Sequence, residues 1–205
     1  MKKLIALGVT IVAALSLAAC GSSSGQKDSS SKTEKASKVD SSKESSKKAA
    51  SSSKKADTKI IPTTPDEDWF YSADQNVYYA GNETMTFTKS EVRDGYDNSK
   101  VLVVYVTIRN NSKEEMDPSN FMMVITGKQK TDTSNVVLDP GTLDSDENGN
   151  DPLQTLEDNF NNSLLPGKTV QAVMLYKLIN NNPVQLIMTD SDGVKNIGTR
   201  EYKVQ

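Results

Sequence analysis

The sequence of 205 residues contains no histidine and only one cysteine, Cys20. Without histidine the chain cannot form a Ser-His-Asp triad or a Cys-His nucleophile pair, and it cannot build zinc sites from His and Cys ligands. A single cysteine excludes an internal disulfide, and no Gly-x-Gly-x-x-Gly motif for a dinucleotide is present. The catalytic groups that remain are a carboxylate pair or a Ser-Lys dyad. We therefore expect a protein that is not an enzyme and carries no cofactor.

The acidic residues that stand side by side in the sequence are the candidates for such a carboxylate pair. They are Glu114-Glu115 and Glu157-Asp158. Both pairs lie in stretches with the composition of loops or surface, which predicts solvated side chains. We therefore assign no catalytic residue.

The N-terminus has the pattern of an export signal. Met1-Lys2-Lys3 is positively charged, and an apolar run from Leu4 to about Leu15 follows. A run of this length is too short to span a bilayer and is typical of a signal peptide. It ends in Leu17-Ala18-Ala19-Cys20, which resembles the lipobox of bacterial prolipoproteins at every position. The resemblance implies that residues 1–19 are removed and that the sulfur of Cys20 carries diacylglycerol.

Lipid on Cys20 predicts where the protein resides and what it contacts. Two or more acyl chains anchor a protein stably, at ~0.8 kcal/mol per buried methylene. We expect a protein anchored to the cell membrane on its extracytoplasmic face, with no nucleic-acid partner. The alternative is a short cytosolic helix that ends in cysteine, but nothing nearby supplies a polar face or a second cysteine.

Residues 20–57 have the composition of a tether. Beyond Cys20 this segment is almost entirely Ser, Lys, Ala, Asp and Glu, with no aromatic residue and Val39 as its only branched aliphatic residue. Such a chain cannot bury enough apolar surface to offset its conformational entropy, so we predict disorder. Its net positive charge would attract anionic headgroups or wall polymers weakly.

Residues 58–205 form the predicted folded domain, which is acidic and long enough for one core. Residues 101–109 are apolar on both faces of a period-two pattern, which predicts a central strand. Short helices are predicted at Thr64-Pro65-Asp66-Glu67 and after Asp151-Pro152. The remaining strand candidates are 84–92, 121–126, 136–138, 170–178, 184–189 and a last strand that ends near Val204 after the Asp192-Gly193 turn. About seven short strands predict an all-β fold, an immunoglobulin-like β-sandwich behind the tether.

The domain resembles the telokin-like, immunoglobulin-fold domains of unknown function found in Gram-positive lipoproteins. The resemblance covers roughly residues 85–204 and implies a fold and a location, but no active site. The residues that carry it are Leu102-Val103-Val104-Tyr105-Val106-Thr107-Ile108-Arg109-Asn110-Asn111-Ser112, Phe121, Leu165-Pro166-Gly167, Tyr176-Lys177-Leu178 and Pro183-Val184-Gln185-Leu186.

Two further segments are candidate ligand sites. Asp144, Asp146 and Asn148, followed by Gly149, match the first half of a calcium-binding EF-hand loop, but Thr155 replaces the glutamate of the twelfth position. A solvated acidic turn is the favoured interpretation of these residues, so we assign no metal ligand. The aromatic residues between Trp69 and Tyr79 could stack on sugar rings, but they are more typical of core packing. The methionines are likewise interpreted as packing residues.

The layout of anchor, tether and domain favours a non-catalytic binding module that engages a cell-wall polymer or an envelope protein. An accessory or chaperone-like subunit would instead pair a free sheet edge with a client strand. A hydrolase would require a pocket that holds two acids about 5–10 Å apart.

Overall fold

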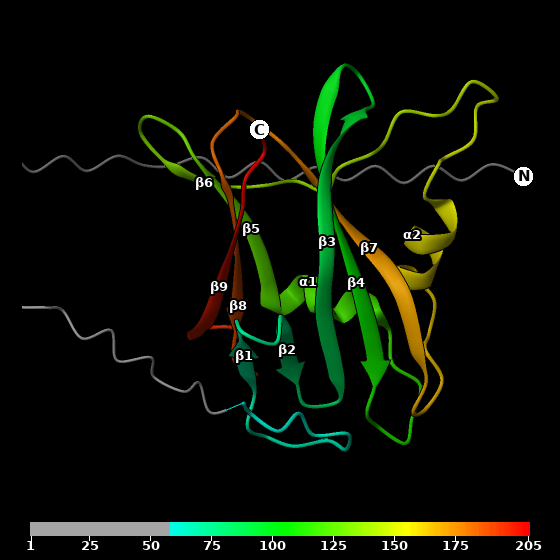
Figure 1. Ribbon diagram of the computed structural model, residues 1–205, viewed down its shortest axis with the longest axis vertical. Coiled ribbons are helices and arrows are strands. Elements are labelled where there is room, and N and C mark those ends of the chain that lie inside the picture. The colour runs from blue at the N-terminus through cyan, green and yellow to red at the C-terminus, as the bar shows by residue number, and fades with distance from the viewer. Residues whose placement is uncertain (1–57) are drawn as a thin grey trace, which may run out of the picture. The chain divides into compact units, whose positions relative to one another are not determined.

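Two antiparallel sheets face each other in a β-sandwich (Figure 1). The computed structural model describes residues 58–205, which belong to one compact unit. The predicted signal peptide, Cys20 and the predicted tether therefore lie outside the described residues. The first sheet has the order β1 (Phe70–Ser72), β2 (Val77–Ala80), β3 (Glu83–Gly95), β4 (Ser99–Asn110) and β7 (Thr169–Lys177). The second has the order β6 (Asn135–Val137), β5 (Ile125–Lys130), β8 (Val184–Thr189) and β9 (Asn196–Tyr202).

The predicted all-β sandwich is confirmed, with nine strands in residues 58–205 where about seven were expected. The two additional strands are β1 and β2, in the aromatic segment that the sequence assigned to no strand. Phe70 on β1 stacks on its register partner Tyr79 on β2, with ring centroids 5.4 Å apart. Tyr78 is buried between the sheets, and its hydroxyl donates to the Thr189 carbonyl at 2.6 Å. The interpretation of these residues as core packing is therefore confirmed for Phe70, Tyr78 and Tyr79.

β4 lies between β3 and β7 and is buried on both faces, as its two-sided apolar pattern predicts. The inner face contributes Leu102, Val104, Val106 and Ile108 to the core between the sheets. The outer face packs against the helix α2 (Gln154–Asn161) and the segment that precedes it. The residues of this second cluster are Val101, Val103, Leu143, Val173 and Leu175, with Tyr105, Leu153 and Leu156 packed against it.

The predicted strand over residues 121–126 is wrong over its first four residues. Pro118–Asn120 forms a 3-10 turn, η1, and Phe121–Val124 forms a single helical turn, α1, before β5 begins at Ile125. The chain passes from the first sheet to the second here, so an extended backbone cannot bridge the change of direction. Phe121 nevertheless packs in the core against Tyr78, with ring centroids 5.7 Å apart.

Of the two predicted helices, one forms. α2 follows Asp151-Pro152 as expected, and the Asp151 carboxylate accepts a hydrogen bond from the Leu153 amide at 2.7 Å. Residues 64–67 are not helical. The Tyr79 hydroxyl donates to the Thr64 carbonyl at 2.7 Å, and the Asp66 carboxylate accepts from the Asp68 amide. These contacts hold the segment in an irregular path under the ends of β1 and β2 (Figure 1).

Residues 58–205 contain no helix that is long and apolar enough to cross a membrane.

Candidate functional site

The lipid-attachment residue predicted from the sequence, Cys20, lies outside the described residues 58–205. The other sequence candidates are all described, and the structure disperses them over the domain rather than bringing them together.

The acidic loop that resembles half of an EF-hand uses its central carboxylate internally. Asp146 accepts hydrogen bonds from the amides of Asn148, at 2.8 Å, and Asn150, at 2.9 Å. These bonds hold the pKa of Asp146 below its usual value. Residues 58–205 contain no group of three or more acidic side chains that could hold a metal ion. The loop is therefore a turn in which the Asp146 carboxylate accepts hydrogen bonds from the backbone of the same loop.

The two acidic pairs lie in different environments. Glu114 and Glu115 are exposed in the loop after β4. Glu157 is half-buried on α2, and one of its oxygens is buried without a hydrogen-bond partner, which the prediction of a solvated pair missed. Burial, followed by the charge of Asp151, raises the pKa of Glu157 to about 7. The carboxylates that act on Glu157 are therefore Asp151, which precedes α2, and its sequence neighbour Asp158.

The free sheet edge required by a chaperone-like role is partly occupied at β7. The segment before α2 lies against this strand: the Gly141 amide donates to the Leu175 carbonyl at 3.0 Å, and the Lys177 amide donates to the Asp139 carbonyl at 2.9 Å.

A concave site lies instead at the end of the sandwich where β2 ends and β3 begins, which is the lower end in Figure 1. Its volume is about 420 Å³, within the range of small-molecule pockets. We call it the end cleft. It is formed by the segment before β1, the β2–β3 turn, η1 with α1, and the β8–β9 loop. The residues that characterise it are Trp69, Glu83, Met116, Phe121, Met123 and Asp192.

Glu83 is the unusual residue of the end cleft. It shares the inward face of β3 with Met85 and Phe87, so it occupies the first inward position of that strand. Its side chain is 4% exposed, and its Oε1 atom is buried without a hydrogen-bond partner. Burial, and then the negative charge of Asp117, raise the pKa of Glu83 to about 7. Glu83 lies one residue before the strand predicted over residues 84–92, and extending the period-two pattern back from Phe87 would have identified it.

The Asn-rich end of β4 fixes the loops around the cleft. The backbone amide of Asn111 donates to the Asn82 carbonyl at 2.7 Å, and the Asn111 side-chain nitrogen donates to Thr84 Oγ1 at 2.8 Å. The Asn110 side chain donates to the carbonyls of Glu114 and Leu164, at 2.7 and 2.8 Å. The motif that carries the family resemblance is therefore a scaffold for this end of the domain.

Trp69 closes one side of the cleft, at a position fixed by Gly81. A Cβ atom on Gly81 would lie 2.7 Å from Trp69 Nε1, and this glycine has a φ of +64°. Both the close approach and the left-handed backbone require glycine. Trp69 is half-buried, and it also lines an adjoining, more open hollow with Asp66, Glu67 and Asp68. Of the aromatic segment, Trp69 is thus the residue available to a ligand in the end cleft.

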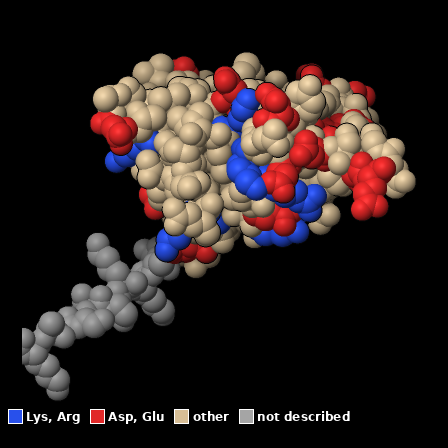
Figure 2. Space-filling view, turned by 90° about the horizontal axis from the view of Figure 1, so that it is seen from above, with Lys and Arg blue, Asp and Glu red and all other residues tan. Residues whose placement is uncertain are grey.

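The charge at the end cleft has one sign. The described residues that line the cleft and the adjoining hollow include five acids and no lysine or arginine. The acids are Asp66, Glu67, Asp68, Glu83 and Asp192. The opposite end of the domain, shown in Figure 2, carries lysine and arginine interspersed with aspartate and glutamate.

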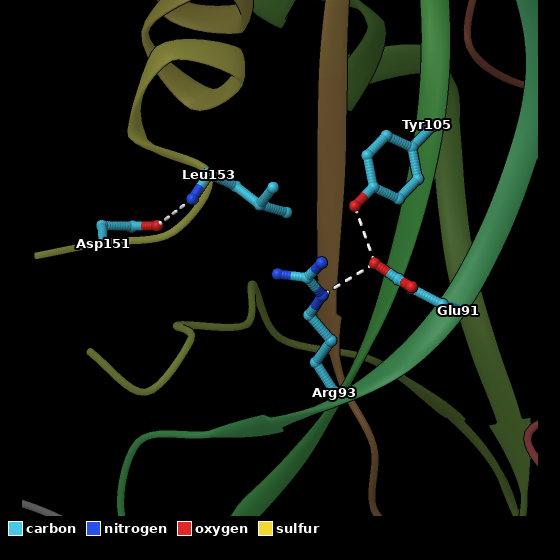
Figure 3. Close-up of polar contacts among 5 residues, drawn as sticks. All are labelled: Glu91, Arg93, Tyr105, Asp151 and Leu153. Atoms are coloured by element: carbon cyan, nitrogen blue, oxygen red, sulfur yellow. Dashed lines mark hydrogen bonds and ion pairs between the residues drawn. The ribbon is translucent and has the colours of Figure 1, made fainter. Parts of the chain in front are cut away.

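A second hollow, of about 460 Å³, lies on the outer face of the first sheet beside α2. Its lining includes Lys89, Tyr105 and Leu156. Figure 3 shows Tyr105 and Arg93 converging on Glu91 at the edge of this region: the Tyr105 hydroxyl and Arg93 Nε each donate to Glu91 Oε1 at 2.7 Å. Hydrogen bonds and the neighbouring cations lower the pKa of Glu91, so its charge is compensated within the protein. This contrasts with Glu83.

Comparisons with known proteins identify a family and a fold. The model of a family described as a domain of unknown function, DUF5067, matches residues 23–190. A search of the curated proteins found no match. The telokin-like resemblance is not the family that matched, and it stays a prediction.

Two solved structures show the similarity of fold. A "putative lipoprotein" from Staphylococcus aureus is 16% identical, with a TM-score of 0.58 over 66% of this chain and 92% of its own. A protein from Enterococcus faecalis is 18% identical, with a TM-score of 0.55 over 67% of this chain and 94% of its own.

Proposed function

The chain belongs to the DUF5067 family of domains of unknown function, and from that premise we propose that it is a lipid-anchored, extracytoplasmic lipoprotein whose β-sandwich is a non-catalytic binding module. The anchor is the diacylglycerol expected on Cys20 of the lipobox, and the binding site is the end cleft. A wall polymer or an envelope protein is the class of partner.

The observation that carries the binding role is Glu83. A carboxyl at an inward position, without an internal partner, costs folding free energy that an apolar residue would not cost. It stands in a concave site with an indole and a methionine on its walls, which is the composition of a ligand pocket. All described charged residues that line the cleft and the adjoining hollow are acids, which argues against anionic polymers as direct ligands of this cleft.

Two observations support the anchor. The lipobox matches at every position, and the similar Staphylococcus aureus structure bears the description of a "putative lipoprotein". Cys20→Ala tests the anchor directly: cells fed a labelled fatty acid should incorporate the label into the unaltered chain and not into the variant. Equal labelling of the two chains, or no label in the unaltered chain, would contradict the lipid anchor.

Photo-crosslinking in living cells tests the binding role. A photoreactive amino acid is placed at Met123, which lines the end cleft and is 74% exposed. The matched control is Tyr96, which is 71% exposed in the β3–β4 turn at the opposite end. Adducts are expected at position 123 and not at position 96. Equal labelling at both positions, or no adduct at either, would contradict a binding role for the cleft.

A further inference from the structure

We infer that the end cleft binds an organic ammonium group carried by its partner, with the cationic nitrogen at the Glu83 carboxylate and the apolar substituents against Trp69 and Met123. This inference rests on the binding role proposed above and names the chemistry of the ligand.

First, Glu83 has no counter-charge among the described residues of the cleft. A buried carboxylate requires a cation or several hydrogen-bond donors, and Glu83 Oε1 has no partner in the structure. Asn110, opposite Glu83 on β4, already uses its side-chain nitrogen for two carbonyls. Because no lysine or arginine of the described chain lines the cleft, a positive charge that pairs with the ionised Glu83 carboxylate would come from a ligand.

The second step is the nature of the cation. A hard metal ion such as calcium takes six to eight oxygen ligands, and residues 58–205 contain no group of three acids suited to one. The cleft offers one buried carboxylate and walls of Trp69, Phe121 and Met123. An indole face attracts an ammonium group through its π electrons, best in a desolvated site. A volume of about 420 Å³ accommodates such a group together with its carbon substituents.

The third step is the approach of the ligand. Asp192 lines the cleft itself, and Asp66, Glu67 and Asp68 line the hollow that adjoins it. A concave surface of one sign concentrates ions of the opposite sign and speeds their association. An anionic ligand would meet repulsion at each of these positions.

Binding is coupled to a proton. The other carboxylates near Glu83 are Asp117, from the segment before η1, and Asp192, from the β8–β9 loop. The described residues that line the cleft include no lysine or arginine. With its pKa raised to about 7, Glu83 is half-protonated at neutral pH. A cation requires the ionised form, so its affinity should increase about tenfold from pH 6 to pH 8.

The test uses the fluorescence of Trp69, since it is the only tryptophan of the sequence. Residues 58–205 are titrated with choline, whose charge does not change with pH, and with its neutral isostere 3,3-dimethylbutan-1-ol. Choline should change the emission with saturation at concentrations on the order of millimolar, and the neutral alcohol should bind at least about tenfold more weakly. The measurements are repeated at pH 6 and pH 8.

Two matched variants test whether the Glu83 carboxylate is the group that binds the cation. Glu83→Gln keeps the shape of the side chain and removes its charge, and it should weaken choline binding at least about tenfold and remove the pH dependence. Glu147→Gln, in the exposed loop before α2, removes the same charge far along the chain from the cleft and should leave the affinity unchanged.

Equal binding of choline and the alcohol, or choline binding that survives Glu83→Gln, would overturn the ammonium inference. The result is separable from the broader proposal. If choline fails but crosslinking at Met123 still yields adducts absent at Tyr96, the ammonium ligand is wrong and the binding role stands. If both fail, the end cleft has neither role.

Discussion

Glu83 and Asn110 lie directly opposite each other at the ends of β3 and β4, and both are buried, but only Asn110 has its polar atoms satisfied. The Asn110 side chain donates to two carbonyls and accepts from the amide and the hydroxyl of Ser112, each at 2.8 Å. Glu83 Oε1 has no partner. One member of the pair therefore stabilises this end of the sandwich, while the other leaves it with an uncompensated acid.

Replacing Glu83 should change how stability depends on pH. Its pKa is raised in the folded state from 4.5 to about 7, so the folded protein holds this proton more tightly than the unfolded chain. The associated stabilisation is complete below pH 4.5 and is lost as the pH rises through 7. Glu83→Gln should therefore match the unaltered protein at pH 4.5 and exceed its unfolding free energy at pH 8, by up to about 3 kcal/mol.

Urea unfolding at both pH values measures this difference. Glu157 also has a raised pKa, in the same range, so the comparison is made between variant and parent at each pH. A Glu83→Gln chain that is less stable than its parent at pH 8 would show that the carboxylate has a partner inside the fold.

Gly81→Ala should disturb both the backbone and Trp69. The position has a φ of +64°, and the new methyl group would lie 2.7 Å from Trp69 Nε1 and 2.9 Å from the Asp66 carbonyl. Gly149→Ala is the matched control, because it has a φ of +82° and no atom within 4 Å of the added Cβ. The control should cost about 1 kcal/mol for the backbone alone. Gly81→Ala should lower the free energy of unfolding by at least about 1 kcal/mol more than the control and shift the tryptophan emission. Equal losses of stability in the two variants would contradict the close packing of Trp69 on Gly81.

Asn110→Ala should loosen the loops around the end cleft. The substitution leaves the Ser112 amide and the Glu114 and Leu164 carbonyls without the side chain that links them. The Leu164 carbonyl keeps a bond from the Met116 amide and the Glu114 carbonyl keeps one from the Ser112 hydroxyl. The cost is therefore that of the four lost hydrogen bonds of Asn110, at about 1 kcal/mol each, and a loss of about 2–4 kcal/mol is expected in denaturant unfolding. Asn148→Ala, in an exposed loop, should have little effect. A loss no larger than that of the control would show that water replaces these bonds freely.

Calcium should leave the unfolding temperature of residues 58–205 unchanged. The Asp146 carboxylate is already engaged by the amides of Asn148 and Asn150, and a bound ion would have to displace them. A thermal scan with calcium, then with chelator, checks this. A stabilisation that Asp146→Ala abolishes would instead make the loop a calcium site, since a ligand at a hundred times its dissociation constant adds about 2.7 kcal/mol.

The sequence alone determined the features that depend on local pattern. The period-two run of β4, apolar on both faces, predicted a central strand, because each face of a buried strand must meet its own apolar layer. The turn at Asp192-Gly193 and the helix after Pro152 were also predicted, since the required backbone angles and caps are properties of the residues themselves. The run that resembles a lipobox at Cys20 is also a local pattern, but it lies outside the described residues and its lipid stays a prediction.

Only the tertiary structure decided the strands β1 and β2, the helical turn at Phe121 and the end cleft. β1 has three residues, and its assignment depends on the stacking of Phe70 on Tyr79 rather than on any pattern of its own. The end cleft unites Trp69, Glu83, Met123 and Asp192, which lie in four different segments of the chain. Burial and charge at such a site arise from the packing of these segments, and no property of the individual residues specifies that they meet.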